Sequence, residues 1–198
     1  MKSLFLILLF SLLIIGNSIL ENFGGWKKGS YRENDMGIDR AFKRTFEYYL
    51  DYFPDADIDF TYRLTVYRQI ANGINYLMCF IDLKKNLNVV QECIVNNPSS
   101  SSNNRNQEFN ILEKNYYKPK KGLLSVNDPR YPRIQNTLYG YTKKMKQKLL
   151  YINKIEIVET TLDTFYIIDG RAEDKEHIYV VGQSKQNTDE YEAYGLIQ

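Results

Sequence analysis

Residues 38–66 read IDRAFKRTFEYYLDYFPDADIDFTYRLTV, which is a helix pattern followed by a strand pattern. In the first part, apolar residues recur at helical spacing before Pro54, at Ile38, Phe42, Phe46, Tyr49 and Phe53. This spacing predicts an amphipathic helix that the proline ends. From residue 60 to 66 apolar and polar residues alternate, which predicts a strand with one buried face. Because extended runs follow at residues 74–83, 89–95 and 109–117, we expect an α+β fold in which an antiparallel sheet packs on one helix.

The second half of the chain repeats this order of elements. Asp128 and Pro129 predict a helix start, with the aspartate as cap and the proline in the first turn. Four apolar residues then repeat the spacing of the first helix, each 96 positions after its counterpart: Ile134, Leu138, Met145 and Leu149. Extended runs at residues 155–158, 164–168 and 177–181 predict strands. The repeat favours two α+β domains in tandem.

A polar stretch, NNPSSSSNNRN at residues 96–106, contains no apolar residue and cannot pack into a core. It is either a linker between domains or a long loop within one domain. We place the first domain at residues 19–117, with this stretch as one of its loops, and the second at residues 118–198.

The first eighteen residues have the pattern of a secretory signal peptide. Lys2 precedes an apolar run from Leu4 to Ile15, and small residues follow at Gly16 and Ser18. A membrane anchor is the alternative, but the run is shorter than the roughly 20 residues that a spanning helix needs. We therefore expect a protein that is secreted, or that is located in the lumen of the secretory-lysosomal pathway, and whose mature form has no membrane partner.

The composition excludes several classes of function. The chain has 198 residues with one His and two Cys, which leaves no multi-histidine zinc site and no dense disulfide scaffold. Its 26 basic and 24 acidic residues nearly cancel, so nucleic acid is not an expected partner. No nucleophile and base pair can be argued from the sequence, and we expect neither an enzyme nor a cofactor.

The two cysteines fit a hairpin. If Cys79 and Cys93 face each other across antiparallel strands, the turn centres on Asn86, in a polar and turn-prone segment. Directly opposed residues can form a disulfide, and export permits one. Two buried thiols are the alternative.

Residues 69–76 read QIANGINY and resemble the first binding loop of the cystatins, Gln-x-Val-x-Gly, often followed by Asn-Tyr. Ala71 stands where the family most often has Val. The order of features also matches the cystatin plan: a signal peptide, a glycine pair before Trp26, one amphipathic helix and then the hairpin. The resemblance covers residues 19 to about 117.

The resemblance implies an antiparallel sheet wrapped around one helix and a reversible inhibitor of papain-like, cathepsin-type cysteine proteases. The protease would be bound by an N-terminal trunk, by a hairpin tip and, more weakly, by a second hairpin: Gly24 and Gly25; Gln69, Ile70, Ala71, Asn72 and Gly73; and Pro98. A positive φ is expected at Gly73, where a tight turn ends. The family has Pro-Trp in the second hairpin, whereas Ser99 follows Pro98 here, so we expect weaker inhibition.

The second half departs further from the family. Residues 159–163, ETTLD, stand where the first half has its binding loop, and two carboxylates replace the Gln and the Gly. We interpret this half as a degenerate cystatin-like domain without inhibitory function. The alternative function for the whole chain is a cystatin-fold extracellular binding protein that inhibits nothing; a secreted enzyme is a third and weaker idea. The sequence makes no prediction of the oligomeric state.

Overall fold

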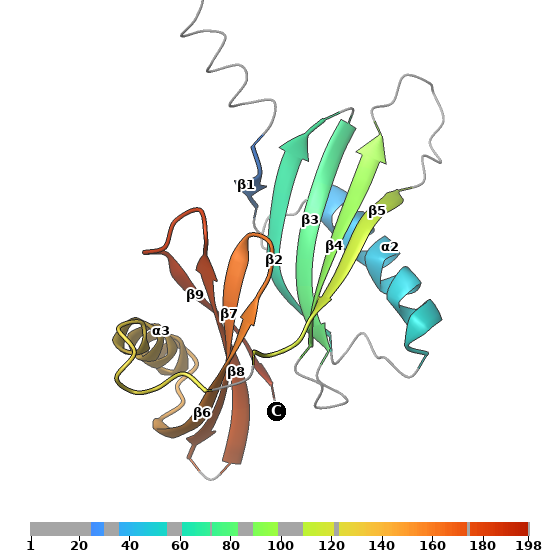
Figure 1. The fold of residues 1–198 in the computed structure, drawn as a ribbon. Coiled ribbons are helices and arrows are strands. Elements are labelled where there is room, and N and C mark those ends of the chain that lie inside the picture. The colour runs from blue at the N-terminus through green and yellow to red at the C-terminus, as the bar shows by residue number, and fades with distance from the viewer. Residues whose placement is uncertain are drawn as a thin grey trace, which may run out of the picture. The chain divides into compact units, whose positions relative to one another are not determined.

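The structure is a computed structural model of the chain (Figure 1). It describes residues 25–29, 36–54, 61–71, 73–82, 89–98, 109–120, 123–173 and 175–197. The predicted signal peptide, Gly24, Asn72 and residues 99–106 of the polar stretch lie outside the described residues.

The described chain has an α+β architecture with two antiparallel sheets. The first sheet has the strand order β1-β2-β3-β4-β5, formed by Lys27–Lys28, Thr61–Ile70, Gly73–Asp82, Val89–Pro98 and Asn110–Tyr117. The second has the order β6-β7-β8-β9, formed by Leu149–Glu159, Asp163–Ala172, Lys175–Ser184 and Tyr191–Ile197. The helices are α2, Met36–Tyr52, and α3, Tyr131–Lys144. The predicted class, sheets combined with helices, is therefore confirmed at this level.

The chain divides into two compact units, and each is described by itself. The first unit gathers Met1–Glu47, Thr65–Met78 and Cys93–Glu113. The second gathers Tyr48–Leu64, Cys79–Glu92 and Lys114–Gln198.

Helix α2 has the apolar face that its periodicity predicts. Its buried residues recur at helical spacing: Ile38, Ala41, Phe42, Thr45, Phe46 and Tyr49. The helix ends at Tyr52, two residues before the proline, as the sequence predicts. The Tyr49 ring packs edge-on against Phe80 of β3 at 5.7 Å, and its hydroxyl donates to Oδ2 of Asp82 at 3.1 Å. Burial, followed by the nearby Asp82 carboxylate, raises the pKa of Tyr49.

Two strands of the first sheet are longer than the sequence predicts, and one of them is more buried. β2 continues to Ile70 and β4 to Pro98, so the polar stretch begins inside a strand. The expected burial of a single face of β2 is wrong in the middle of the strand, where Leu64, Thr65, Val66 and Tyr67 are all buried. Both faces of the strand are therefore covered at that level, which alternation in one strand cannot reveal.

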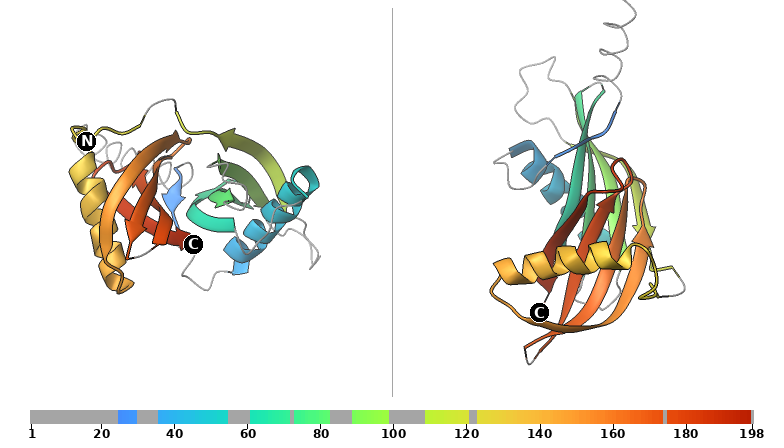
Figure 2. Two further views of the ribbon diagram at one scale, coloured as in Figure 1. Left: turned by 90° about the horizontal axis from the view of Figure 1, so that it is seen from below. Right: turned by 90° about the vertical axis from the view of Figure 1, so that its left-hand side faces the viewer.

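Helix α3 packs on strands β8 and β9 of the second sheet, and Figure 2 shows it lying across one face. Buried side chains from the helix and the strands form one core cluster, which includes Ile134, Leu138, Tyr166 and Tyr179. At Gly182 of β8 the packing is especially close. A Cβ there would lie 2.7 Å from a ring carbon of Tyr194.

Three details of the second unit differ from the predictions. The helix ends at Lys144, so Met145 is exposed and Leu149 begins β6 instead of continuing the helix. The predicted cap is also wrong, because the helix begins at Tyr131 and has no side-chain cap. The predictions do not include strand β9.

The carboxylate of Asp128 binds an arginine instead of capping the helix. Arg130 donates from Nε to Oδ1 at 2.9 Å and from Nη2 to Oδ2 at 2.7 Å, a two-pronged arrangement. These side-chain bonds from Arg130 lower the pKa of Asp128 from 3.8 to about 2. The pair therefore fixes the turn that precedes α3.

Glu92 of β4, in the same unit, is a buried carboxylate that accepts several hydrogen bonds. Thr161 donates to it from the backbone N–H at 3.0 Å and from its hydroxyl at 2.6 Å, and Tyr117 donates at 3.1 Å. Since buried carboxylates are costly without donors, these bonds explain how Glu92 is tolerated at 1% exposure.

Candidate functional site

The hairpin between β2 and β3 places the predicted binding loop at one end of the first sheet. β2 ends at Ile70 and β3 begins at Gly73, and the N–H of Ala71 donates to the carbonyl of Gly73 at 3.1 Å. Gly73 has φ 112°, a conformation that a residue with a Cβ adopts only with strain. The expected positive φ at Gly73 is therefore confirmed.

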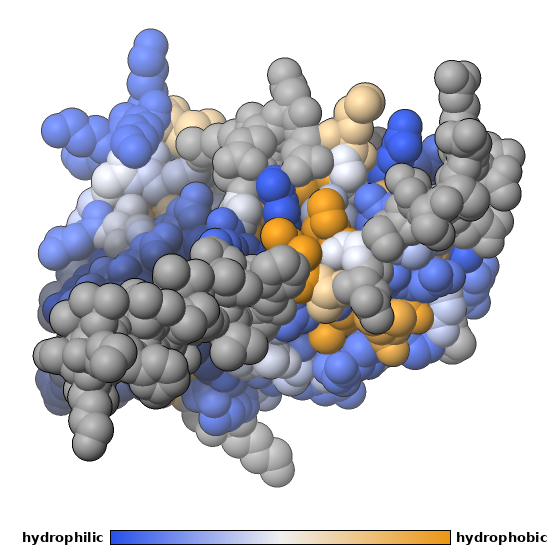
Figure 3. Space-filling model, turned by 90° about the horizontal axis from the view of Figure 1, so that it is seen from above, coloured by the Kyte–Doolittle hydropathy of each residue, from blue (hydrophilic) through white to orange (hydrophobic). Residues whose placement is uncertain are grey.

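This hairpin end exposes apolar side chains. Ile70 is 56% exposed and Ile74 is 37% exposed, and Ala71 between them is exposed as well. Figure 3 views this end of the first sheet from above and shows hydrophobic residues at the surface there. An uncharged, apolar tip can enter a partner's cleft without the cost of burying a charge.

The N-terminal strand β1 brings the glycine trunk towards the same end. β1 pairs antiparallel with β2, with Lys27 opposite Arg68 and Lys28 opposite Tyr67. In this register the residues before Lys27 run towards Ile70, and Gly25 is exposed. Of the predicted glycine pair, the structure therefore places Gly25 beside the hairpin end, while Gly24 lies outside the described residues.

The end of β4 reaches this region too. Pro98 is its last residue, and Asn96, two residues earlier, donates from Nδ2 to Oδ1 of Asn75 on β3 at 2.6 Å. The Nδ2 of Asn75 in turn donates to Oε1 of Gln69 on β2 at 3.4 Å. We call Gln69, Asn75 and Asn96 the amide ladder.

The amide ladder is a feature that the sequence analysis missed. Asn75 entered there only as part of a family pattern. One signal was available in the sequence, because Asn is disfavoured in strand interiors and its presence within a predicted strand indicates an amide with specific partners. The signal does not identify those partners, because they depend on which strands pair and in which register.

The two cysteines lie in β3 and β4 and are both buried. The structure shows both side chains as thiols, and Cys79 Sγ lies 3.9 Å from Oε2 of Glu92. The disulfide expected for an exported protein stays a prediction.

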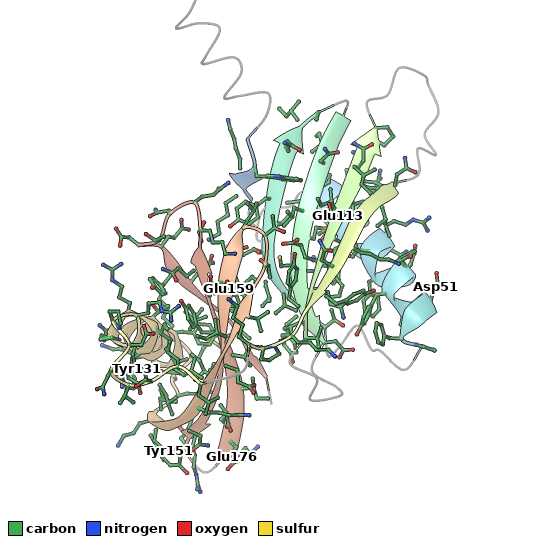
Figure 4. The ribbon with its side chains drawn as sticks, in the orientation of Figure 1. Asp51, Glu113, Tyr131, Tyr151, Glu159 and Glu176 are labelled. Atoms are coloured by element: carbon green, nitrogen blue, oxygen red, sulfur yellow. The ribbon has the colours of Figure 1, made fainter. Side chains whose placement is uncertain are left out.

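The hairpin between β6 and β7 occupies the position predicted for the second loop, but its carboxylates do not form an exposed tip. Glu159, at the end of β6 (Figure 4), forms an ion pair with Lys120 at 2.7 Å, which lowers the pKa of Glu159. Asp163 is buried, and its backbone N–H and carbonyl both contact the hydroxyl of Thr160. These groups hold the turn together and do not resemble the apolar tip of the first hairpin.

Among the residues that the structure describes, no group of three or more His, Cys, Asp or Glu side chains is placed to hold a metal ion. No helix within that part of the chain is long and apolar enough to cross a bilayer. No protein-family model matches the chain, and no curated protein matches it.

Proposed function

We propose that the protein is a secreted, reversible inhibitor of papain-like cysteine proteases. The observation that carries the proposal is the convergence of exposed Gly25, the apolar hairpin tip and the end of β4 at one end of the first sheet. The resemblance of residues 69–76 to a cystatin binding loop supports the same function.

The proposed inhibitor acts as a wedge. Ile70 and Ala71 enter the protease cleft, and exposed backbone groups of the tip bond to its walls. Gly73 lets the chain turn back without a Cβ against the partner. The segment before Lys27 lies extended in the neighbouring part of the cleft. This mode of action needs no covalent step and no cofactor, because steric blockage of the catalytic Cys is sufficient.

Titration of the chain from residue 19 against papain tests this proposal. Inhibition should fall sharply on truncation to Trp26 and on the substitution Gly73→Arg. Gly140→Arg is the matched control, because Gly140 is exposed on α3 and a Cβ there meets nothing within 4 Å. Equal inhibition by the two arginine variants, or no inhibition by the parent at high micromolar concentration, would refute the wedge.

The second candidate is an extracellular binding protein with this fold that inhibits no protease. Ser99 in place of the family's Trp favours it, since large aromatic side chains often dominate interface energies. Absence of inhibition by the parent chain would support this candidate, and the Trp variant Ser99→Trp would then leave papain unaffected.

A further inference from the structure

We propose that Asn75 is a positioning residue, which holds the hairpin and the end of β4 together as one preorganised binding surface. This inference rests on the proposed function, because the surface that it orders is the proposed wedge.

The geometry of the amide ladder supports this role. An amide side chain has a donor end and an acceptor end, and Asn75 uses both. Its Nδ2 donates to Gln69 at 3.4 Å and its Oδ1 accepts from Asn96 at 2.6 Å. The side chain therefore ties three strands of the first sheet together, across sequence separations of 6 and 21 residues.

The location of the ladder decides what it affects. Gln69 immediately precedes exposed Ile70, and Asn75 immediately follows exposed Ile74. The ladder thus lies at the base of the tip, where apolar side chains point to solvent. All three amides are half-buried, so water can replace part of a lost bond and the cost to folding is small. The loss of order at the tip lowers the binding affinity instead, because the loop must adopt a single conformation when it binds.

The test compares Asn75→Leu, Asn75→Asp and the parent chain. Leu has similar size and neither polar end, whereas Asp keeps the acceptor for Asn96 and loses the donor to Gln69. We expect Asn75→Leu to weaken papain binding about tenfold, which is about 1.4 kcal/mol at 25 °C, mainly through faster dissociation. Asn75→Asp should fall between Leu and the parent. Asn136→Leu, on an exposed position of α3, is the control.

Two further readouts separate positioning from a general structural role. Backbone order parameters of Ala71 and Gly73 in the free protein should fall from about 0.85 towards about 0.6 in Asn75→Leu, while those of α2 stay unchanged. The double variant Asn75→Leu with Asn96→Leu should bind no more weakly than Asn75→Leu alone, because Asn75→Leu already removes the hydrogen bond from Asn96.

The outcomes distinguish the two proposals. If the parent chain does not inhibit papain, the proposed function fails, and the order parameters still decide whether Asn75 positions the tip. If the parent inhibits and Asn75→Leu matches it in both affinity and tip order, the positioning role is overturned while the proposed function stands.

Discussion

The φ of 112° at Gly73 makes the substitution Gly73→Ala a direct test of the hairpin geometry. This angle lies well beyond the left-handed minimum near about +57° that L-residues occasionally occupy. An alanine must therefore either keep a strained backbone or move the tip. A strained backbone lowers the unfolding free energy, whereas a displaced tip weakens binding.

The magnitude follows from two opposing effects. Backbone strain of this kind costs about 1–3 kcal/mol, and the upper part of the range applies because φ is far from any favoured region. Loss of glycine's freedom in the unfolded chain offsets about 0.4–1 kcal/mol. We expect a net loss of about 1–2.5 kcal/mol in unfolding free energy, or a melting temperature lowered by about 2–10 °C. If the tip relaxes instead, the same free energy appears as weaker binding, with about 1.4 kcal/mol for each tenfold.

Urea unfolding and papain titration of the same samples measure both parts. Gly140→Ala is the matched control of opposite sign, because Gly140 lies in the interior of α3 with open space around its Cα. There an alanine should raise the unfolding free energy by about 0.5–1 kcal/mol. If Gly73→Ala changes neither the unfolding free energy nor the affinity by more than about 0.3 kcal/mol, the tip does not depend on the positive φ, and the reasoning is refuted.

Three further predictions concern stability in the second unit. Gly182→Ala introduces a Cβ 2.7 Å from the Tyr194 ring and should lower the unfolding free energy by about 1–3 kcal/mol; a melting curve like the parent's would contradict this packing. Tyr49→Phe removes the hydroxyl that donates to buried Asp82 and should cost about 1–3 kcal/mol in urea unfolding, whereas a negligible loss would mean that this hydrogen bond does not stabilise the fold. The folded pKa of Asp128, about 2, lies below its ordinary 3.8, so this carboxylate stabilises the fold above about pH 4, and the contribution is lost as the pH falls towards about 2. Asp128→Asn should therefore flatten the unfolding profile in that window, and an unchanged slope would show that the arginine pair contributes nothing.

Local sequence patterns predicted α2 well. The helix depends on apolar residues three and four positions apart and on a proline after its end, and both are properties of one short segment. The second helix shows the limit of the same pattern. Leu149 continues the spacing, but it begins β6 because the chain turns at Lys146, whose φ is 56°. The spacing of apolar residues alone therefore does not show where the helix ends and the strand begins.

The candidate site was predicted in part. The hairpin was predicted from its resemblance to a cystatin loop, and the positive φ of Gly73 was predicted from the geometry of a tight turn, which depends on neighbouring residues alone. Ile74 was not identified as exposed, since the strand that begins there is otherwise buried from Tyr76 onwards. The partners of Asn75 were also missed, because one of them lies 21 residues away.

The sequence by itself determined several elements: a helix with one apolar face, a hairpin with a glycine at its turn and a polar stretch after the third predicted strand. The tertiary structure decided which segments meet. The register of β1 against β2 directs Gly25 towards Ile70, and the bond from Asn96 to Asn75 brings the end of β4 to the same surface. The physical reason is that helix periodicity and turn geometry arise between near neighbours in the chain, whereas strand pairing is chosen by the burial of whole sheet faces.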